Sequence, residues 1–443
     1  MTRGRLLRVL GLGFGLAVII GNTIGGGILR TPGEVAAHLP QPALFMAAWI
    51  IGGLYALVGA LQIAELGAML PRSGGQYHFA RHALGDYAGF VVGWSDWLST
   101  CGTTAAVSLV VGDLSVMLAG APATVAPRVA VAVTLIFAIA QWRSIGNGRA
   151  VQNVTAVAKA VAFVAVIAAA LIWGPDAPAG SSAAGALHGW AIAPAFLLSL
   201  QSVIYTYDGW TAVVYFSEEV RDAGRAVPRA LIGGVLLVVA IYLLANAALL
   251  EVLSIDGLRG DAFALGTVAE RLAGPYGLTA MLVVAIVSLL SAVNANHLMA
   301  SRVLFAMSRD GLFAARAAAV NAGGTPAVAL GLSTLTALLF ILFGRTFGQV
   351  ITVLSFFFVA NYSLSFVSLF VLRAREPDRA RPYRAWGYPW TTALALVGSI
   401  AFLAGAVAGD TRHSLLALLL LAASYPVFRL RRGGLGPVRV VGR

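Results

Sequence analysis

Cysteine, lysine and charged residues are scarce in this chain of 443 residues. Its one cysteine, Cys101, leaves no partner for a disulfide within the chain. Only 11% of the residues are charged and 59% are apolar, whereas about a quarter of the residues of a soluble domain are charged. The phosphate-loop, HExxH and GxSxG motifs are absent. The sequence therefore argues against an enzyme and predicts no cofactor.

Long apolar segments fill nearly the whole chain. About 20 apolar residues suffice to cross a bilayer, and the sequence predicts twelve such spans in one transmembrane domain covering residues 1–443. They cover roughly 8–37, 43–70, 84–118, 126–142, 151–173, 190–217, 230–252, 276–307, 327–344, 348–372, 389–408 and 412–429. The expected fold class is an all-α membrane protein, and the basic N-terminal segment is interpreted as leading into a retained first span.

Basic residues are distributed unequally between the two sides of this topology. The 30 Lys and Arg residues give a net charge of +12, but most fall in alternate connections. The exceptions are Arg30, Arg128, Arg259, Arg271, Arg345 and Arg412. This asymmetry follows the positive-inside rule. It predicts a multi-pass protein of the plasma (inner) membrane with both termini in the cytoplasm, and it points away from nucleic acid.

Two spans contain helix-breaking segments at mid-membrane depth. The first reads GNTIGGGIL, from Gly21 to Leu29, and three adjacent glycines do not lie on one helix face. The sixth contains Asp208-Gly209, which puts an ionisable group near the membrane centre. Because glycine is unfavourable inside a helix, both segments are expected to be unwound.

The two breaks are five spans apart, which predicts a five-plus-five inverted repeat with discontinuous helices 1 and 6. Repeat one would cover about 8–173, repeat two about 190–372, and two extra helices about 389–429. Half-helix N-termini offer N–H groups to anions and half-helix C-termini offer carbonyls to cations. A free α-amino acid carries one group of each charge, so it is the predicted substrate.

Several motifs, in order, resemble those of bacterial amino acid permeases of the amino acid–polyamine–organocation superfamily, in the L-type (LAT-like) branch. They are GNTIGGGILRTP, AELGAMLPRSGGQYHFARHALGDYAGFVVGW, YDGWTAVVYFSEEVRDAGRAVPRALI and NANHLMASRVLFAMSRDGLF. The resemblance covers spans 1 to 11 and implies a LeuT-like fold and a permease or exchanger.

The resemblance also implies a substrate site in the unwound segment from Thr23 through Ile24 to Gly27. The substrate carboxylate would bind the backbone N–H groups of Gly26 and Gly27, with Gly25 beside them. The substrate ammonium would meet the carbonyls of Thr23, Tyr205 and Asp208, and Tyr205 stands where the family has an aromatic gate.

Lys159 is the single lysine and lies within span 5. In sodium-coupled relatives a bound cation ties span 1 to span 8, and a span-5 lysine resembles a replacement that the protein itself carries. Lysine changes its protonation more readily than arginine when it is desolvated. Lys159 is therefore expected to act as a fixed tether or as a titrating group, and to make transport independent of sodium.

Two polar residues leave alternatives open. Asp208 is a counter-charge for cationic substrates, a cap that stabilises the break, or a proton carrier. Asn294, in span 8, lines the cavity or forms a helix–helix hydrogen bond. The expected substrates are neutral L-amino acids. The alternative is a carrier of cationic amino acids or polyamines that works by exchange or is coupled to protons.

A channel or receptor is the rival outside the carriers, because broken helices also line ion filters. A channel would need a filter repeated around an axis, and the sequence offers one asymmetric pair of breaks. The connection AGAPATVAP between spans 3 and 4 has no cysteine, so no disulfide-linked subunit is expected. His78 and His82 lack a third candidate ligand nearby, so no metal site is expected.

Overall fold

The structure, a computed structural model, describes residues 10–143, 145–175, 187–343, 347–409 and 411–434. Within these ranges the chain is helical, as predicted, and has no strand beyond one isolated bridge between Leu10 and Val220. The helices of the first half are α1 (Leu12–Thr23), α2 (Gly26–His38), α3 (Pro42–Met69), α4 (Gln76–Leu84), α5 (Asp86–Ala119), α6 (Ala126–Arg143) and α7 (Ile145–Trp173).

The second half begins with α8 (Ile192–Tyr207) and a 3₁₀ segment, η3 (Trp210–Glu219). The remaining helices are α9 (Ala223–Leu258), α10 (Ala264–Arg309), α11 (Ala327–Phe343), α12 (Phe347–Arg375), α13 (Trp390–Gly409), α14 (Thr411–Ala422) and α15 (Ser424–Gly434). Short 3₁₀ turns cover Ala123–Val125, Gly189–Ala191 and Ala315–Ala318.

Ten helices in the described ranges are long and apolar enough to cross a membrane, and the bent pair α1–α2 makes an eleventh span. The shorter apolar helix α11 coincides with the segment expected as span 9. The multi-pass architecture is therefore confirmed. The inverted repeat remains a prediction.

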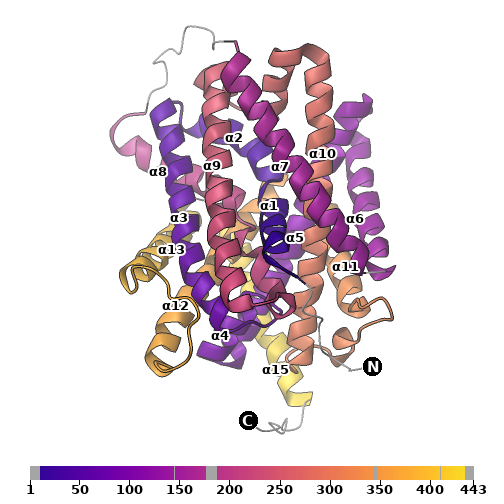
Figure 1. Cartoon of the computed structure of the whole chain (residues 1–443), viewed down its shortest axis with the longest axis vertical. Coiled ribbons are helices and arrows are strands. Elements are labelled where there is room, and N and C mark those ends of the chain that lie inside the picture. Colours follow the sequence, from indigo (N-terminus) through magenta and orange to yellow (C-terminus); the bar gives the residue numbers. More distant parts are fainter. Residues whose placement is uncertain (1–9, 144, 176–186, 344–346, 410, 435–443) are drawn as a thin grey trace.

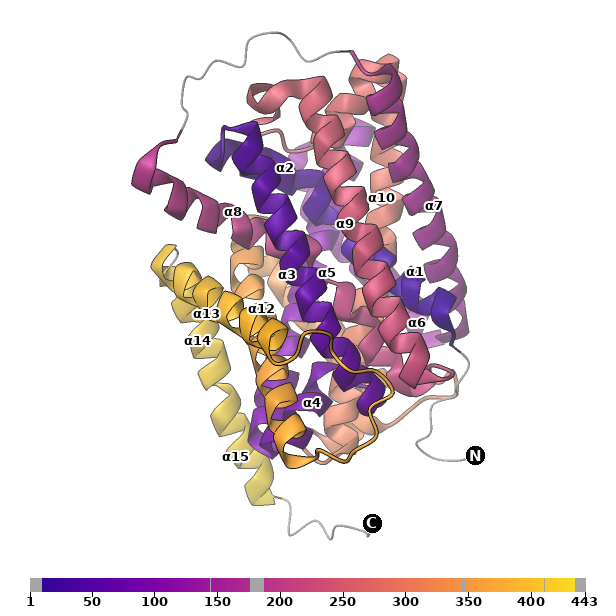
Figure 2. The same cartoon turned by 60° about the vertical axis from the view of Figure 1, so that its left-hand side comes forward.

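The helices form one upright bundle in which α5 and the described part of α12 are the most enclosed. Figure 1 shows α7 and α9 in front of the α1–α2 region. Figure 2 shows α13, α14 and α15 on one side of the bundle beside α12, with α7 at the opposite side. Helix α2 lies toward one end and α4 and α15 toward the other in both views. The hydrophobic core includes Ile24, which lies in the break between α1 and α2.

Candidate functional site

The two predicted breaks are present, and they face each other. Helix α1 ends at Thr23 and α2 begins at Gly26 after a bend of 43°. Helix α8 ends at Tyr207, and Gly209 takes a positive φ of 111°. A Cβ atom at Gly209 would lie 3.0 Å from the Asn22 carbonyl carbon and from the Thr23 nitrogen. Glycine is therefore required here both for its backbone conformation and for the close approach of the two breaks.

A small cavity lies at this junction. Its volume is ≈ 20 Å³, which is room for about one water molecule. It is lined by Asn22, Thr23, Gly25, Gly26, Gly27, Thr103, Val107, Tyr205, Thr206, Asp208 and Ala292. Six of the residues predicted for the site thus come together, and the cavity must widen before it can hold an amino acid.

Gly26 and Gly27 begin α2, so their backbone N–H groups have no carbonyl partner in a preceding turn of that helix. These amides and the positive end of the helix dipole suit an anion. Gly27 also packs closely on α8, because a Cβ atom there would lie 2.8 Å from the Thr206 Oγ1 atom. Glycine therefore allows both the contact between helices and the approach of a ligand to the backbone.

Two of the three carbonyls expected to meet the substrate ammonium already accept hydrogen bonds within the protein. The Tyr242 hydroxyl of α9 donates to the Thr23 oxygen at 2.7 Å. The Tyr205 oxygen accepts from the Asp208 nitrogen at 3.0 Å. A carbonyl oxygen has two lone pairs and can accept more than one hydrogen bond. Sequence reasoning missed Tyr242, whose only signal was a hydroxyl within an apolar span.

The Asp208 side chain has a partner. The Tyr362 hydroxyl of α12 donates to its carboxylate, and Asp208 also lines the cavity. Tyr362 is 1% exposed, and its ring packs at a tilt of 31° against that of Trp210, with centroids 5.1 Å apart. Tyr362 lies in the predicted span 10 and was not singled out from the sequence. Its contact ties the second break to α12.

Tyr205, the expected gate, lines the cavity from α8. It is 8% exposed, and its ring centroid lies 6.4 Å from that of Phe358 on α12. An aromatic ring at this position narrows the cavity.

Lys159 extends from α7 to the end of α1. Its Nζ atom donates to the Gly21 oxygen at 2.7 Å, the Ile24 oxygen at 2.9 Å and the Ser288 oxygen at 3.2 Å. The side chain is 1% exposed. Gly21 and Ile24 lie at the C-terminal end of α1, where carbonyls lack a donor in a following turn of the helix. The ammonium joins α7 to α1 through these two oxygens and to α10 through the Ser288 oxygen.

The structure does not bring Asn294 or Ile24 to the lining of the cavity. The Asn294 Oδ1 atom accepts from Gln141 of α6 at 3.0 Å, the helix–helix alternative. Asn296, two residues later, donates to the Asn22 Oδ1 atom at 2.9 Å and so reaches the first break. Ile24 contributes its carbonyl to Lys159 rather than a side chain to the cavity wall.

Ion pairs lie on both sides of this cavity, toward the two ends of the bundle. Arg30 of α2 pairs with Asp113 of α5 at 2.7 Å. At the other end, Glu218 of η3 pairs with Arg309 of α10 at 3.2 Å. A buried pair, Arg302 with Glu219, adds to the second group at 3.1 Å. Both groups connect the broken helices to α5 or α10.

The amino acid permease family model matches residues 13–423, which includes every element of this site. The chain belongs to the amino acid permease family. The serine/threonine exchanger SteT of Bacillus subtilis (strain 168) is 29% identical over 429 residues, covering 96% of each chain. The b(0,+)-type amino acid transporter 1 of Homo sapiens is 28% identical over 389 residues, covering 86% of this chain and 79% of that one.

A third relative is the large neutral amino acids transporter small subunit 2 of Oryctolagus cuniculus, 28% identical over 395 residues. The match covers 86% of this chain and 72% of that relative. This permease is thus an amino acid transporter of the amino acid–polyamine–organocation superfamily, built as a multi-pass membrane protein.

Proposed function

We propose that this permease exchanges neutral L-amino acids across the plasma membrane without sodium, and that both its termini lie in the cytoplasm. The observation that carries sodium independence is the position of the Lys159 ammonium, which donates to three backbone oxygens at the end of α1 and on α10. A positive charge there makes a second bound cation unfavourable, because like charges in a site of low dielectric repel strongly.

The substrate would be held by its backbone groups. Its carboxylate would bind the N–H groups of Gly26 and Gly27 at the start of α2, and Gly25 would leave room for the approach. Its ammonium would bind the carbonyl oxygens of Thr23, Tyr205 and Asp208. Tyr205 would close over the substrate as the gate.

A neutral side chain is proposed because the Asp208 carboxylate already accepts a hydrogen bond from Tyr362. A buried carboxylate that is held in this way needs no cationic substrate for its stability. The relatives add support, since the name of one is serine/threonine exchanger and that of another is large neutral amino acids transporter small subunit 2. Small neutral side chains also require the least widening of a ≈ 20 Å³ cavity.

The decisive experiment is counterflow in proteoliposomes made from the purified permease. Unlabelled alanine, serine, leucine, lysine or arginine is loaded inside, and uptake of labelled serine is measured with external sodium or choline. The proposal predicts stimulation by the neutral amino acids and the same rate in both salts. A defined sodium affinity would refute the assignment of Lys159, and stimulation by lysine and arginine alone would refute the neutral substrate.

Lys159→Met tests the same assignment within the protein. It removes two hydrogen bonds to the end of α1, and bonds from a charged donor contribute about 1.5–3 kcal/mol each. Serine exchange is expected to fall at least ten-fold. Ser288→Ala, which removes only a hydroxyl that donates to the Ile24 oxygen at 3.2 Å, is the matched control and should retain most of the exchange.

A further inference from the structure

A second, larger pocket opens where α12 ends and the chain turns toward α13. Its volume is ≈ 340 Å³, and it is lined by Arg373, Ala374, Pro377, Arg381, Arg384 and Tyr388. It shares no lining residue with the cavity between the broken helices. Three of its lining residues are arginines, so the pocket suits an anion rather than a zwitterionic amino acid.

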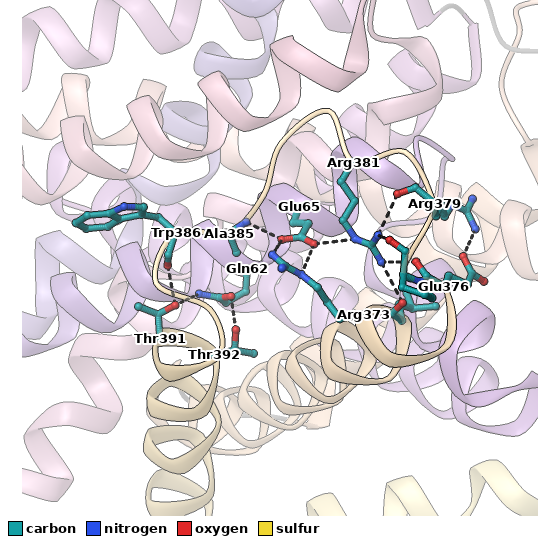
Figure 3. Close-up of polar contacts among 12 residues, drawn as sticks. Gln62, Glu65, Arg373, Glu376, Arg379, Arg381, Ala385, Trp386, Thr391 and Thr392 are labelled. Carbon is teal, nitrogen blue, oxygen red and sulfur yellow. Dashed lines mark hydrogen bonds and ion pairs between the residues drawn. The ribbon is translucent and has the colours of Figure 1, made fainter.

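The Glu65 carboxylate of α3 holds two of these arginines, Arg373 and Arg381, in place. Figure 3 shows the carboxylate between them. Arg373 donates to both Glu65 oxygens, at 2.8 and 2.7 Å, and the Arg381 Nε atom lies 3.2 Å from one of them. The Glu65 side chain is fully buried and also accepts from the Ala385 nitrogen at 2.6 Å. The Glu65 carboxylate therefore positions the two arginines, and both of its oxygens already accept hydrogen bonds.

Donors remain on the pocket side. The four Nη hydrogen bonds of Arg381 go to backbone oxygens of residues 372, 376, 377 and 379. In contrast, no acceptor within the described ranges contacts the Nη1 atom of Arg373, the guanidinium of Arg384 or the hydroxyl of Tyr388. The Arg373 guanidinium lies 4.1 Å above the Tyr388 ring, so these donors are held together.

The local charge is positive even when every carboxylate is counted. Residues 373–384, RAREPDRARPYR, hold five arginines against Glu376 and Asp378. Glu376 is already paired, with Arg379 at 2.6 Å and His82 at 2.7 Å. With Glu65 included, the arginines still exceed the carboxylates by two. A phosphate group, which arginine binds in a bidentate manner, would balance this excess.

Two exposed tryptophans indicate the depth of the pocket in the membrane. Trp386 and Trp390, on either side of Tyr388 in the sequence, are 81% and 80% exposed. Exposed tryptophans of membrane proteins lie at the level of the lipid headgroups. We propose that this pocket binds the phosphate of an anionic phospholipid headgroup, held by Arg373, Arg384 and Tyr388.

The proposed headgroup site lies where α3, α12 and the segment before α13 meet. Arg373 lies in the last turn of α12, Tyr388 precedes α13, and Glu65 of α3 contacts Arg373 and the Ala385 nitrogen. Gln62, one turn before Glu65, also accepts from Thr392 of α13 at 2.6 Å. Neutralising the excess charge at this junction stabilises the contact between α13 and the bundle, so the lipid raises the melting temperature of the permease.

The test is a lipid titration of the purified full-length permease in a neutral detergent, read as a shift in melting temperature. The three probes are short-chain phosphatidylglycerol, short-chain phosphatidylcholine and inorganic phosphate. Phosphatidylglycerol is expected to raise the melting temperature saturably and the other two far less. Arg384→Gln removes an exposed guanidinium with no structural partner, and it should weaken the apparent affinity for phosphatidylglycerol about five-fold.

Two further variants make the test specific. Tyr388→Phe keeps the ring beneath Arg373 and removes only the hydroxyl, so it should also weaken the affinity. Arg229→Gln, at an exposed arginine of α9 outside the pocket, changes the net charge equally and should leave the affinity unchanged. Equal loss in all three variants, or no loss in any, would overturn the pocket. Equal stabilisation by inorganic phosphate would overturn the lipid as its ligand, and equal stabilisation by phosphatidylcholine would overturn the role of headgroup charge.

Discussion

Gly27→Ala is expected to force apart α2 and α8 at a point where the two helices are in close contact. A Cβ atom at Gly27 would lie 2.8 Å from the Thr206 Oγ1 atom and 2.9 Å from its Cα and Cγ2 atoms. Carbon atoms pack best at about 3.5–4.0 Å, so α2 and α8 would have to separate by roughly 0.6–1 Å. The Thr206 Cα atom belongs to the backbone, and a change of side-chain rotamer cannot relieve that contact.

Overpacking of this kind costs about 1–3 kcal/mol. If the strain acts on the closed, substrate-bound arrangement, kcat/KM should fall between about five-fold and about a hundred-fold. The assay is initial-rate serine counterflow in proteoliposomes, with protein content and monodispersity matched by size-exclusion chromatography. Gly233→Ala on α9 is the control, because its nearest neighbour would be the Leu16 Cδ2 atom at an ordinary 3.8 Å.

Gly25→Ala separates steric strain from loss of the ligand contact. The nearest atoms to a Cβ atom there lie at 3.8, 3.9 and 4.0 Å, so the protein itself can accept the methyl group. The reasoning about helix contact is wrong if Gly27→Ala transports as fast as Gly233→Ala. It is also wrong if Gly25→Ala and Gly27→Ala lose the same amount, since a direct block of substrate would then explain both.

Three further experiments test the second break and the ion pair between Arg30 and Asp113. Tyr362→Phe removes the hydroxyl that donates to Asp208. The carboxylate, without its side-chain donor, should lower kcat/KM for alanine and raise the ratio of lysine to alanine uptake; an unchanged ratio would argue against the cap. Asp208→Asn is expected to slow alanine, leucine, lysine and arginine alike, and selective loss of the two cationic substrates would identify a basic amino acid carrier. Arg30 and Asp113 form a partly exposed pair at 2.7 Å, so a double-mutant cycle on substrate affinity should give a coupling of about 0.2–1 kcal/mol. Zero coupling would show that the pair does not stabilise the closed state.

The positions of the two helix breaks could be predicted from the sequence, because the residues that cause a break lie within it. Adjacent glycines cannot pack on one helix face, and an aspartate before a glycine disfavours a continuous helix at mid-membrane depth. The chain is unwound at Gly25 and at Asp208–Gly209, as these residues require. Lys159 was also identifiable from the sequence, since a lone lysine in an apolar span must find partners for its ammonium.

The partners of these residues were decided only by the tertiary structure. Asn294 and Asn296 differ by about 200° around their helix, and the sequence cannot say which of them faces the break. Tyr242 and Tyr362 lie far along the chain from Thr23 and Asp208, and only the packing of α9 and α12 against the breaks brings their hydroxyls there. Local composition determines where a helix unwinds, because the cost of the break arises within a few residues. The groups that bind the exposed backbone come from distant spans, so their identity depends on how the whole bundle packs.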